Sequence, residues 1–146
     1  MHHYRTRPSC TNMDEAWQAI KVLLVPSVWY EAWGIVVIEA HLRGIPVICS
    51  NAGALSETMR GLDHVIPVNA IGGERNADGT YAVPEQDVSP WVQALNELMC
   101  DRQRYEKLST RVREETKQWL EEMNETALEN WLIGLATKAN KHGVFW

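Results

Sequence analysis

Apolar residues are densest in the stretch Val22–Glu57, and the polar breaks within it predict its secondary structure. Val22–Val25 is a short, branched run typical of a buried strand. The nearly all-apolar run Ile35–Leu42 predicts a buried helix, which the following Gly44 ends. Ile45–Cys49 predicts a second buried strand. This strand–helix–strand order is a βαβ unit, so the sequence predicts an α/β fold, a Rossmann-like parallel sheet with flanking helices.

The pattern continues less regularly after Glu57. A short helix is expected to end at Gly61, and Val65–Val68 predicts another strand. Asn69–Tyr81 is rich in Gly, Asn and Asp, which is typical of a surface loop or a small hairpin. We interpret residues 69–82 as a loop insertion in the fold.

Three amphipathic helices are expected toward the C-terminal end. Ser89 is predicted to cap the first of them, with Pro90 at its first helical position. Asp101 and Asn124 are predicted to cap the other two. The side chains expected to face inward are Trp91, Leu95, Leu98 and Met99, then Tyr105, Leu108, Val112 and Trp119, and finally Leu128, Trp131, Leu132 and Leu135.

Length and charge restrict the classes of partner. The 146 residues, of which 45% are hydrophobic, predict a single domain over residues 1–146. The net charge is −5 and no basic cluster stands out, so neither nucleic acid nor an anionic membrane is the expected partner. No apolar run has the length of a membrane span.

The cysteines and histidines suggest no metal chemistry. Cys10, Cys49 and Cys100 are odd in number and far apart, which favours reduced thiols in the cytoplasm over disulfides or a zinc site. His41 and His64 are expected to be ordinary surface or interface residues. The sequence therefore predicts no metal site.

The candidate chemistry lies where the first predicted loop joins its helix. Gly34 lies between Glu31 and Glu39, which seven residues separate. The free N–H groups and positive dipole of a helix N-terminus favour a diphosphate, and glycine allows its close approach. Carboxylates repel a diphosphate but accept hydrogen bonds from hydroxyls. A nucleotide sugar fits this arrangement better than a free nucleotide.

The same stretch resembles the donor-binding motif of retaining glycosyltransferases with the GT-B fold, family 4 (glycosyl transferase group 1). That family has P-S-x-x-E-x-x-G, an E-x7-E pair, then E-A-x-x-x-G-x-P-V-I and a small-residue loop ending in glutamate. Ala54 stands where the family often has a second glycine. The matching residues are Pro26, Ser27, Glu31, Gly34, Glu39, Ala40, Gly44, Pro46, Val47, Ile48, Gly53 and Glu57.

The resemblance implies roles for these residues. It implies that Glu31 is catalytic and contacts the transferred sugar, while Glu39 contacts the ribose of the donor. It places the backbone of Ala32, Trp33, Gly34 and Ile35 on the diphosphate and sugar. The donor is then a nucleotide-diphosphate sugar, a substrate, and no cofactor is expected.

Structural explanations compete with these roles. A glutamate at a helix end is most often a solvated charge, but Glu39 interrupts an apolar helix and needs a partner, either a ligand hydroxyl or a donor such as Ser27 or Asn51. Glu57 could simply favour a helix N-terminus. The aromatic side chains Trp29, Tyr30 and Trp33 could pack in the core or wall the sugar pocket.

The chain resembles only the later, C-terminal part of a GT-B second domain. The expected partner is therefore an N-terminal acceptor-binding domain or a separate chain. The family's basic Arg/Lys pair has no counterpart, since Arg5, Arg7, Arg43 and Arg60 do not match it by position.

Three hypotheses stay open. The chain is part of such an enzyme, or a stand-alone nucleotide-sugar-binding module without catalysis, or an interaction protein that reuses the fold. A homodimer through an open sheet edge or the Trp-rich helices is also expected.

Overall fold

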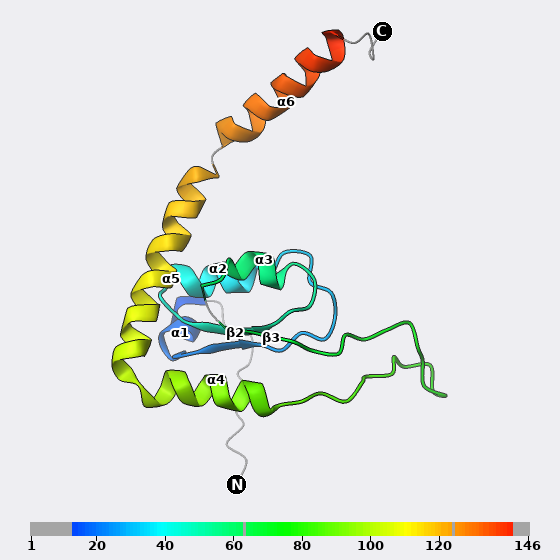
Figure 1. The fold of residues 1–146 in the computed structure, drawn as a ribbon, viewed down its shortest axis with the longest axis vertical. Coiled ribbons are helices and arrows are strands. Elements are labelled where there is room, and N and C mark those ends of the chain that lie inside the picture. The colour runs from blue at the N-terminus through cyan, green and yellow to red at the C-terminus, as the bar shows by residue number, and fades with distance from the viewer. Residues whose placement is uncertain (1–12, 63, 124, 142–146) are drawn as a thin grey trace.

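A three-stranded parallel sheet forms the centre of the molecule (Figure 1). The structure, a computed structural model, describes residues 13–62, 64–123 and 125–141. The strands are β1 (Leu23–Val25), β2 (Val47–Ser50) and β3 (His64–Ile66), in the order β1-β2-β3. Ile48 pairs with Leu24 on one side and with His64 on the other. The predicted α/β, Rossmann-like parallel sheet is confirmed.

The helices lie on both faces of this sheet. In Figure 1, α2 and α3 lie above the strands and α4 lies below them, while α5 runs along one side and α6 extends away from the body. The bounds are α1 Met13–Gln18, α2 Ile35–Leu42, α3 Leu55–Met59, α4 Ser89–Cys100, α5 Arg102–Glu122 and α6 Glu125–Lys141.

The two faces of β2 belong to two separate hydrophobic clusters. Val47 and Cys49 point into a cluster with α1, α2 and α3, whereas Ile48 points into a second cluster with α4. All three side chains are fully buried. The unbroken apolar run that predicted this strand is therefore explained by burial on both faces, as in α/β proteins generally.

Helix α2 has the bounds that its apolar run predicted, Ile35–Leu42. It ends where expected, because Gly44 has φ 69° and lies against α5. A Cβ at Gly44 would lie 2.9 Å from Ser109 Oγ, and that hydroxyl donates a 2.6 Å hydrogen bond to the Gly44 carbonyl. Glycine at this position therefore allows α2 and α5 to pack closely.

The starts of α4 and α5 show one wrong and one confirmed prediction. Ser89 is not the cap of α4. The N-cap is Val88, and Asp87 Oδ1 accepts a 2.9 Å hydrogen bond from Ser89 N. That hydrogen bond lowers the pKa of Asp87. Asp101 caps α5 as predicted, because its Oδ1 accepts a 2.9 Å hydrogen bond from Arg104 N.

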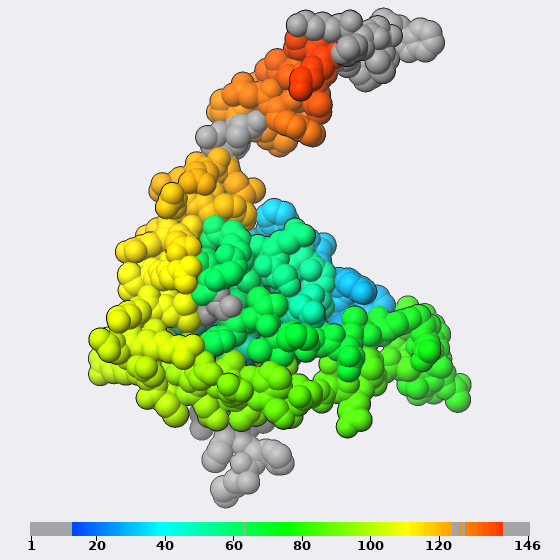
Figure 2. Space-filling model, viewed as in Figure 1, coloured from blue at the N-terminus to red at the C-terminus, as the bar shows by residue number. Residues whose placement is uncertain are grey.

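The inward stripe predicted for the last helix is wrong. Leu128, Trp131, Leu132 and Leu135 are between 45% and 61% exposed, because α6 leaves the body (Figure 2). Met99 is also exposed, whereas His41, expected at the surface, is buried. The predicted cap Asn124 lies outside the described residues.

The segment between β3 and α4, residues 67–88, is an excursion at one end of the sheet (Figures 1 and 2). Arg75 and Tyr81 form an antiparallel bridge, so the excursion contains the small hairpin that its composition allowed. Its status as an insertion stays a prediction. Across the described residues, no helix has both the length and the apolar character needed to cross a membrane.

Candidate functional site

The segments that follow the strands meet at the carboxyl edge of the sheet, where open α/β sheets bind their ligands. Glu31 lies in the segment after β1, and its backbone forms a parallel bridge with Gly53, which follows β2. The Glu31 carbonyl also accepts a 2.9 Å hydrogen bond from Ala54 N. A Cβ at Gly53 would overlap the Glu31 carbonyl oxygen, so glycine is required for this approach.

The N-terminus of α2 has no side-chain cap and is partly exposed. Gly34 is its N-cap, with φ 73° in the left-handed region, and no side chain caps the helix. The Gly34 carbonyl accepts a 2.9 Å hydrogen bond from Val37 N. Ile35, the first helical residue, is 63% exposed. Thus no described side chain caps the helix at the position where the sequence predicts an anion to bind.

The backbone of Trp33 is hydrogen-bonded to a side chain of α3. The Thr58 hydroxyl donates a hydrogen bond to the Trp33 carbonyl and lies 3.0 Å from the Ala54 carbonyl. Thr58 is itself buried. The backbone just before Gly34 is thus anchored to α3, the helix that follows β2. No sequence motif pointed to Thr58.

Glu39 lies in the second turn of α2 and is half-buried. Within the described part of the chain, its carboxylate takes part in no hydrogen bond. Neither of the two protein donors considered for it forms a hydrogen bond with it. Ser27 Oγ donates to the Trp29 carbonyl at 2.8 Å, and the side chain of Asn51 accepts from Val68 N at 3.0 Å. Of the partners that the sequence predicted for Glu39, the structure therefore provides neither Ser27 nor Asn51, which leaves a ligand hydroxyl.

A hollow of about 260 Å³ adjoins Trp33. Neither Glu31 nor Glu39 lines it. The Trp33 and Trp119 rings are stacked there, with centroids 6.5 Å apart. The residues that line the hollow are Trp33, Ala54, Glu57, Thr58, Arg60 and Trp119. Glu57, which the sequence left between two interpretations, forms part of this wall.

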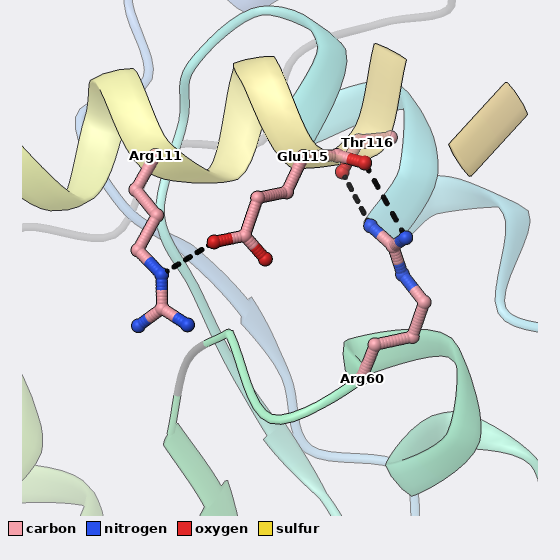
Figure 3. A network of polar contacts seen from close by, with 4 residues as sticks. All are labelled: Arg60, Arg111, Glu115 and Thr116. Carbon is pink, nitrogen blue, oxygen red and sulfur yellow. Dashed lines mark hydrogen bonds and ion pairs between the residues drawn. The ribbon is translucent and has the colours of Figure 1, made fainter. Parts of the chain in front are cut away.

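Arg60 joins this region to α5 (Figure 3). It adopts the left-handed conformation at the end of α3, with φ 50°, and reaches across to α5. Its Nη2 donates to Thr116 Oγ1 at 3.1 Å and its Nη1 to the Glu115 carbonyl at 3.4 Å. Its guanidinium also lies over the Trp119 ring, 4.6 Å from the centroid. No local sequence signal indicated this contact, since the partners lie more than fifty residues apart.

The excursion contacts the segment that carries Glu31. Ile71 N donates to the Val28 carbonyl at 2.8 Å, and the Trp29 and Tyr81 rings meet edge to face with centroids 5.1 Å apart. Trp29 is about half exposed, and Tyr30 is 70% exposed. Trp29 therefore packs against the excursion, while Trp33 faces α5 on the other side of Glu31.

Metal chemistry has no candidate site in ranges 13–62, 64–123 and 125–141, where no group of three or more His, Cys, Asp or Glu side chains could hold an ion. Cys49 is buried and Cys100 is exposed, neither forms a disulfide among the described residues, and Cys10 lies outside these ranges.

Comparison with known families places this geometry in context. The family model described as "Glycosyl transferases group 1" matches residues 2–119, which include the sheet, the open α2 N-terminus and both walls of the hollow. Helix α6 lies outside the matched region. No curated protein matches the chain significantly.

Proposed function

Because the chain belongs to the group 1 glycosyl transferases, we propose that it forms the donor-binding domain of a retaining GT-B, family 4 enzyme. In this proposal the domain binds a nucleotide-diphosphate sugar, whose sugar passes to an acceptor hydroxyl with retention of configuration. Glu31 contacts the transferred sugar and Glu39 the ribose. The donor is a substrate, and the reaction needs no further cofactor.

The open N-terminus of α2 carries the proposal. Its first N–H groups lack a side-chain cap, and the helix dipole makes this end positive. Gly34 adopts a left-handed φ of 73° at the N-cap, where the chain turns into the helix. The exposed Ile35 leaves access from solvent. These features favour the phosphates of a donor at this position.

The carboxylates support a sugar on either side of that diphosphate. Glu31 is exposed at the carboxyl edge, and its backbone is fixed against Gly53. Glu39 takes part in no hydrogen bond among the described residues, and a half-buried carboxylate gains from a hydroxyl donor. Both side chains are thus available as acceptors.

In the transfer, the acceptor oxygen bonds the anomeric carbon while the bond from that carbon to the diphosphate breaks. The proton of the acceptor hydroxyl passes to an oxygen of the departing diphosphate. Negative charge grows on the departing diphosphate, and the N–H groups of α2 stabilise it. The acceptor is held by an N-terminal domain or a separate chain in this proposal.

Thermal unfolding of the chain with uridine, guanosine and adenosine diphosphates tests donor binding. At 100 times Kd, one of them stabilises the fold by about 2.7 kcal/mol, a Tm rise of about 5–10 °C. Glu39→Gln weakens binding roughly tenfold or more, because a charge-assisted hydrogen bond is lost. Glu121→Gln, an exposed α5 glutamate, is the matched control and leaves the shift unchanged.

A Tm that no nucleotide moves would contradict the proposal and favour an interaction protein. Nucleotide binding without sugar release, even with an acceptor-binding domain supplied, would favour the stand-alone binding module. Release of nucleoside diphosphate from a nucleotide sugar would exclude that module.

Self-association belongs to the same proposal. Among the described residues, β1 pairs only with β2, and Leu24 on β1 is 45% exposed. An open edge of this kind favours pairing with another chain. Light scattering at high concentration gives the dimer mass if this is correct and the monomer mass if it is not. On the basis of the cysteine usage, we place the protein in the cytoplasm.

A further inference from the structure

The hollow lined by Trp33 and Trp119 has features of a binding site, and its lining includes neither Glu31 nor Glu39. Its walls come from the loop before α2, from α3 with its cap, and from α5. Its volume of about 260 Å³ is below the ~300–1,000 Å³ of sites for drug-sized ligands. It therefore suits a ligand of one ring.

The aromatic wall favours a saturated ring over a planar one. The Trp33 and Trp119 rings, inclined by 25° with centroids 6.5 Å apart, are within the ~4.5–7 Å of aromatic pairs in contact. Because the two rings stack on each other, each uses one face in this pair. Trp33 is 47% exposed, so part of its indole remains available. The negative face of an indole attracts the C–H bonds on one face of a pyranose ring.

The polar wall offers one acceptor and one donor. The Glu57 carboxylate forms no hydrogen bond or ion pair with any described residue. Arg60 uses its two Nη atoms on α5, but its buried Nε–H has no partner among the described residues. A buried donor without a partner is destabilising. A sugar hydroxyl both accepts and donates, so it matches this pair.

We propose that this hollow is a saccharide subsite that takes a single pyranose ring. The ring's C–H face lies on Trp33, and its hydroxyls meet Glu57 and the Nε–H of Arg60. The source of the ring rests on the proposed function: it is either the sugar of the donor or a sugar of the acceptor, because Trp33 directly precedes the Gly34 turn.

Saturation-transfer NMR on the full chain tests this subsite with methyl glucoside, galactoside and mannoside at millimolar concentration. We expect at least one glycoside to bind and Glu57→Gln to weaken it roughly tenfold or more. Trp119→Phe weakens it as well. The matched controls are Glu121→Gln and Trp131→Phe, which alter exposed residues far from the hollow and leave binding unchanged.

The two sources are separated by adding a nucleotide sugar. Displacement of the glycoside by the nucleotide sugar, but not by the nucleoside diphosphate, assigns the ring to the donor. Binding of the glycoside beside the intact nucleotide sugar assigns it to the acceptor.

Absence of binding by all three glycosides overturns the subsite, as does binding that Glu57→Gln and Trp119→Phe leave unchanged. Displacement of the glycoside by a free nucleoside overturns it too, because the hollow then holds a base. Nucleotide stabilisation without glycoside binding rejects the subsite alone. Glycoside binding without nucleotide stabilisation rejects the donor proposal alone.

Discussion

Two glycine-bearing regions lie at the same edge of the sheet and differ in what their glycines touch. At the joint around α2, a Cβ at Gly53 would overlap the Glu31 carbonyl, and one at Gly34 would lie 2.7 Å from Leu55 Cδ2. In the excursion, Gly72, Gly73 and Gly79 have nothing within 4 Å. Packing therefore demands glycine at the joint, whereas in the excursion only Gly79, with φ 84°, has a backbone conformation that favours glycine.

The excursion is held mainly by its own hydrogen bonds. Asn76 N donates to the Thr80 carbonyl at 2.8 Å, and Asp78 Oδ1 accepts from both the N–H and the hydroxyl of Thr80. Those two hydrogen bonds lower the pKa of Asp78. The joint, in contrast, is tied to α3 through Ala54 and Thr58, and to α5 through Trp119. Substitutions at the joint are therefore expected to change the free energy of unfolding and nucleotide binding strongly, and substitutions in the excursion only weakly.

The largest effect is expected for Gly53→Ala. The φ of 63° costs an L-residue about 1–2 kcal/mol, and the overlap with the Glu31 backbone adds to this. We expect the free energy of unfolding in urea to fall by more than ~2 kcal/mol, and nucleotide binding to be lost. A Gly53→Ala variant as stable as the parent would show that the two regions do not differ.

Gly34→Ala comes next and has a matched partner in Gly79→Ala, since both positions have positive φ, 73° and 84°. In each variant the left-handed backbone conformation lowers the free energy of unfolding by about 1–2 kcal/mol. Gly34→Ala also pushes on Leu55, so its loss in urea denaturation is the larger. Only Gly34→Ala abolishes stabilisation by nucleotide. Equal losses of nucleotide binding in both variants would contradict the site assignment.

Thr58→Val tests the tie between α3 and Trp33. The substitution keeps the shape of the side chain but leaves the Trp33 carbonyl without its donor. Loss of this hydrogen bond is expected to lower the free energy of unfolding by about 1 kcal/mol. Urea denaturation measures it, with Thr110→Val on the exposed face of α5 as the control. A change no greater than that control would mean that the tie contributes nothing.

The smallest effect is expected for Gly72→Ala. This position has no positive φ and no neighbour, so the free energy of unfolding should change by less than ~0.5 kcal/mol. Nucleotide binding should also be unchanged. A loss comparable to that of Gly34→Ala in either measurement would show that the excursion is packed as tightly as the joint.

The parts of the fold that sequence predicts well are those whose signal is local. The apolar run of α2 and the Gly44 stop predicted that helix to the residue, and Asp101 predicted the start of α5. Ser89 misled because Asp87, two residues earlier, already accepts its N–H. The α6 stripe misled because periodicity identifies an apolar face but not whether the chain returns to bury it.

The candidate site was predictable only as far as its motif extends. Gly34 lies at the helix start and the carboxyl edge where the spacing required it. Trp119 could not be found in this way, because its contact with Trp33 depends on how α5 crosses α2. Arg60 likewise finds its partners on α5 through tertiary packing, which no local pattern records.

Strand β2 is bonded on both edges and covered on both faces, whereas β1 and β3 each have one strand neighbour among the described residues. Its amides should thus exchange with deuterium only when the whole domain opens, and later than those of the flanking strands. The exchange rate in Val47–Ser50 would report global stability, while the outer strands and the excursion would report local opening.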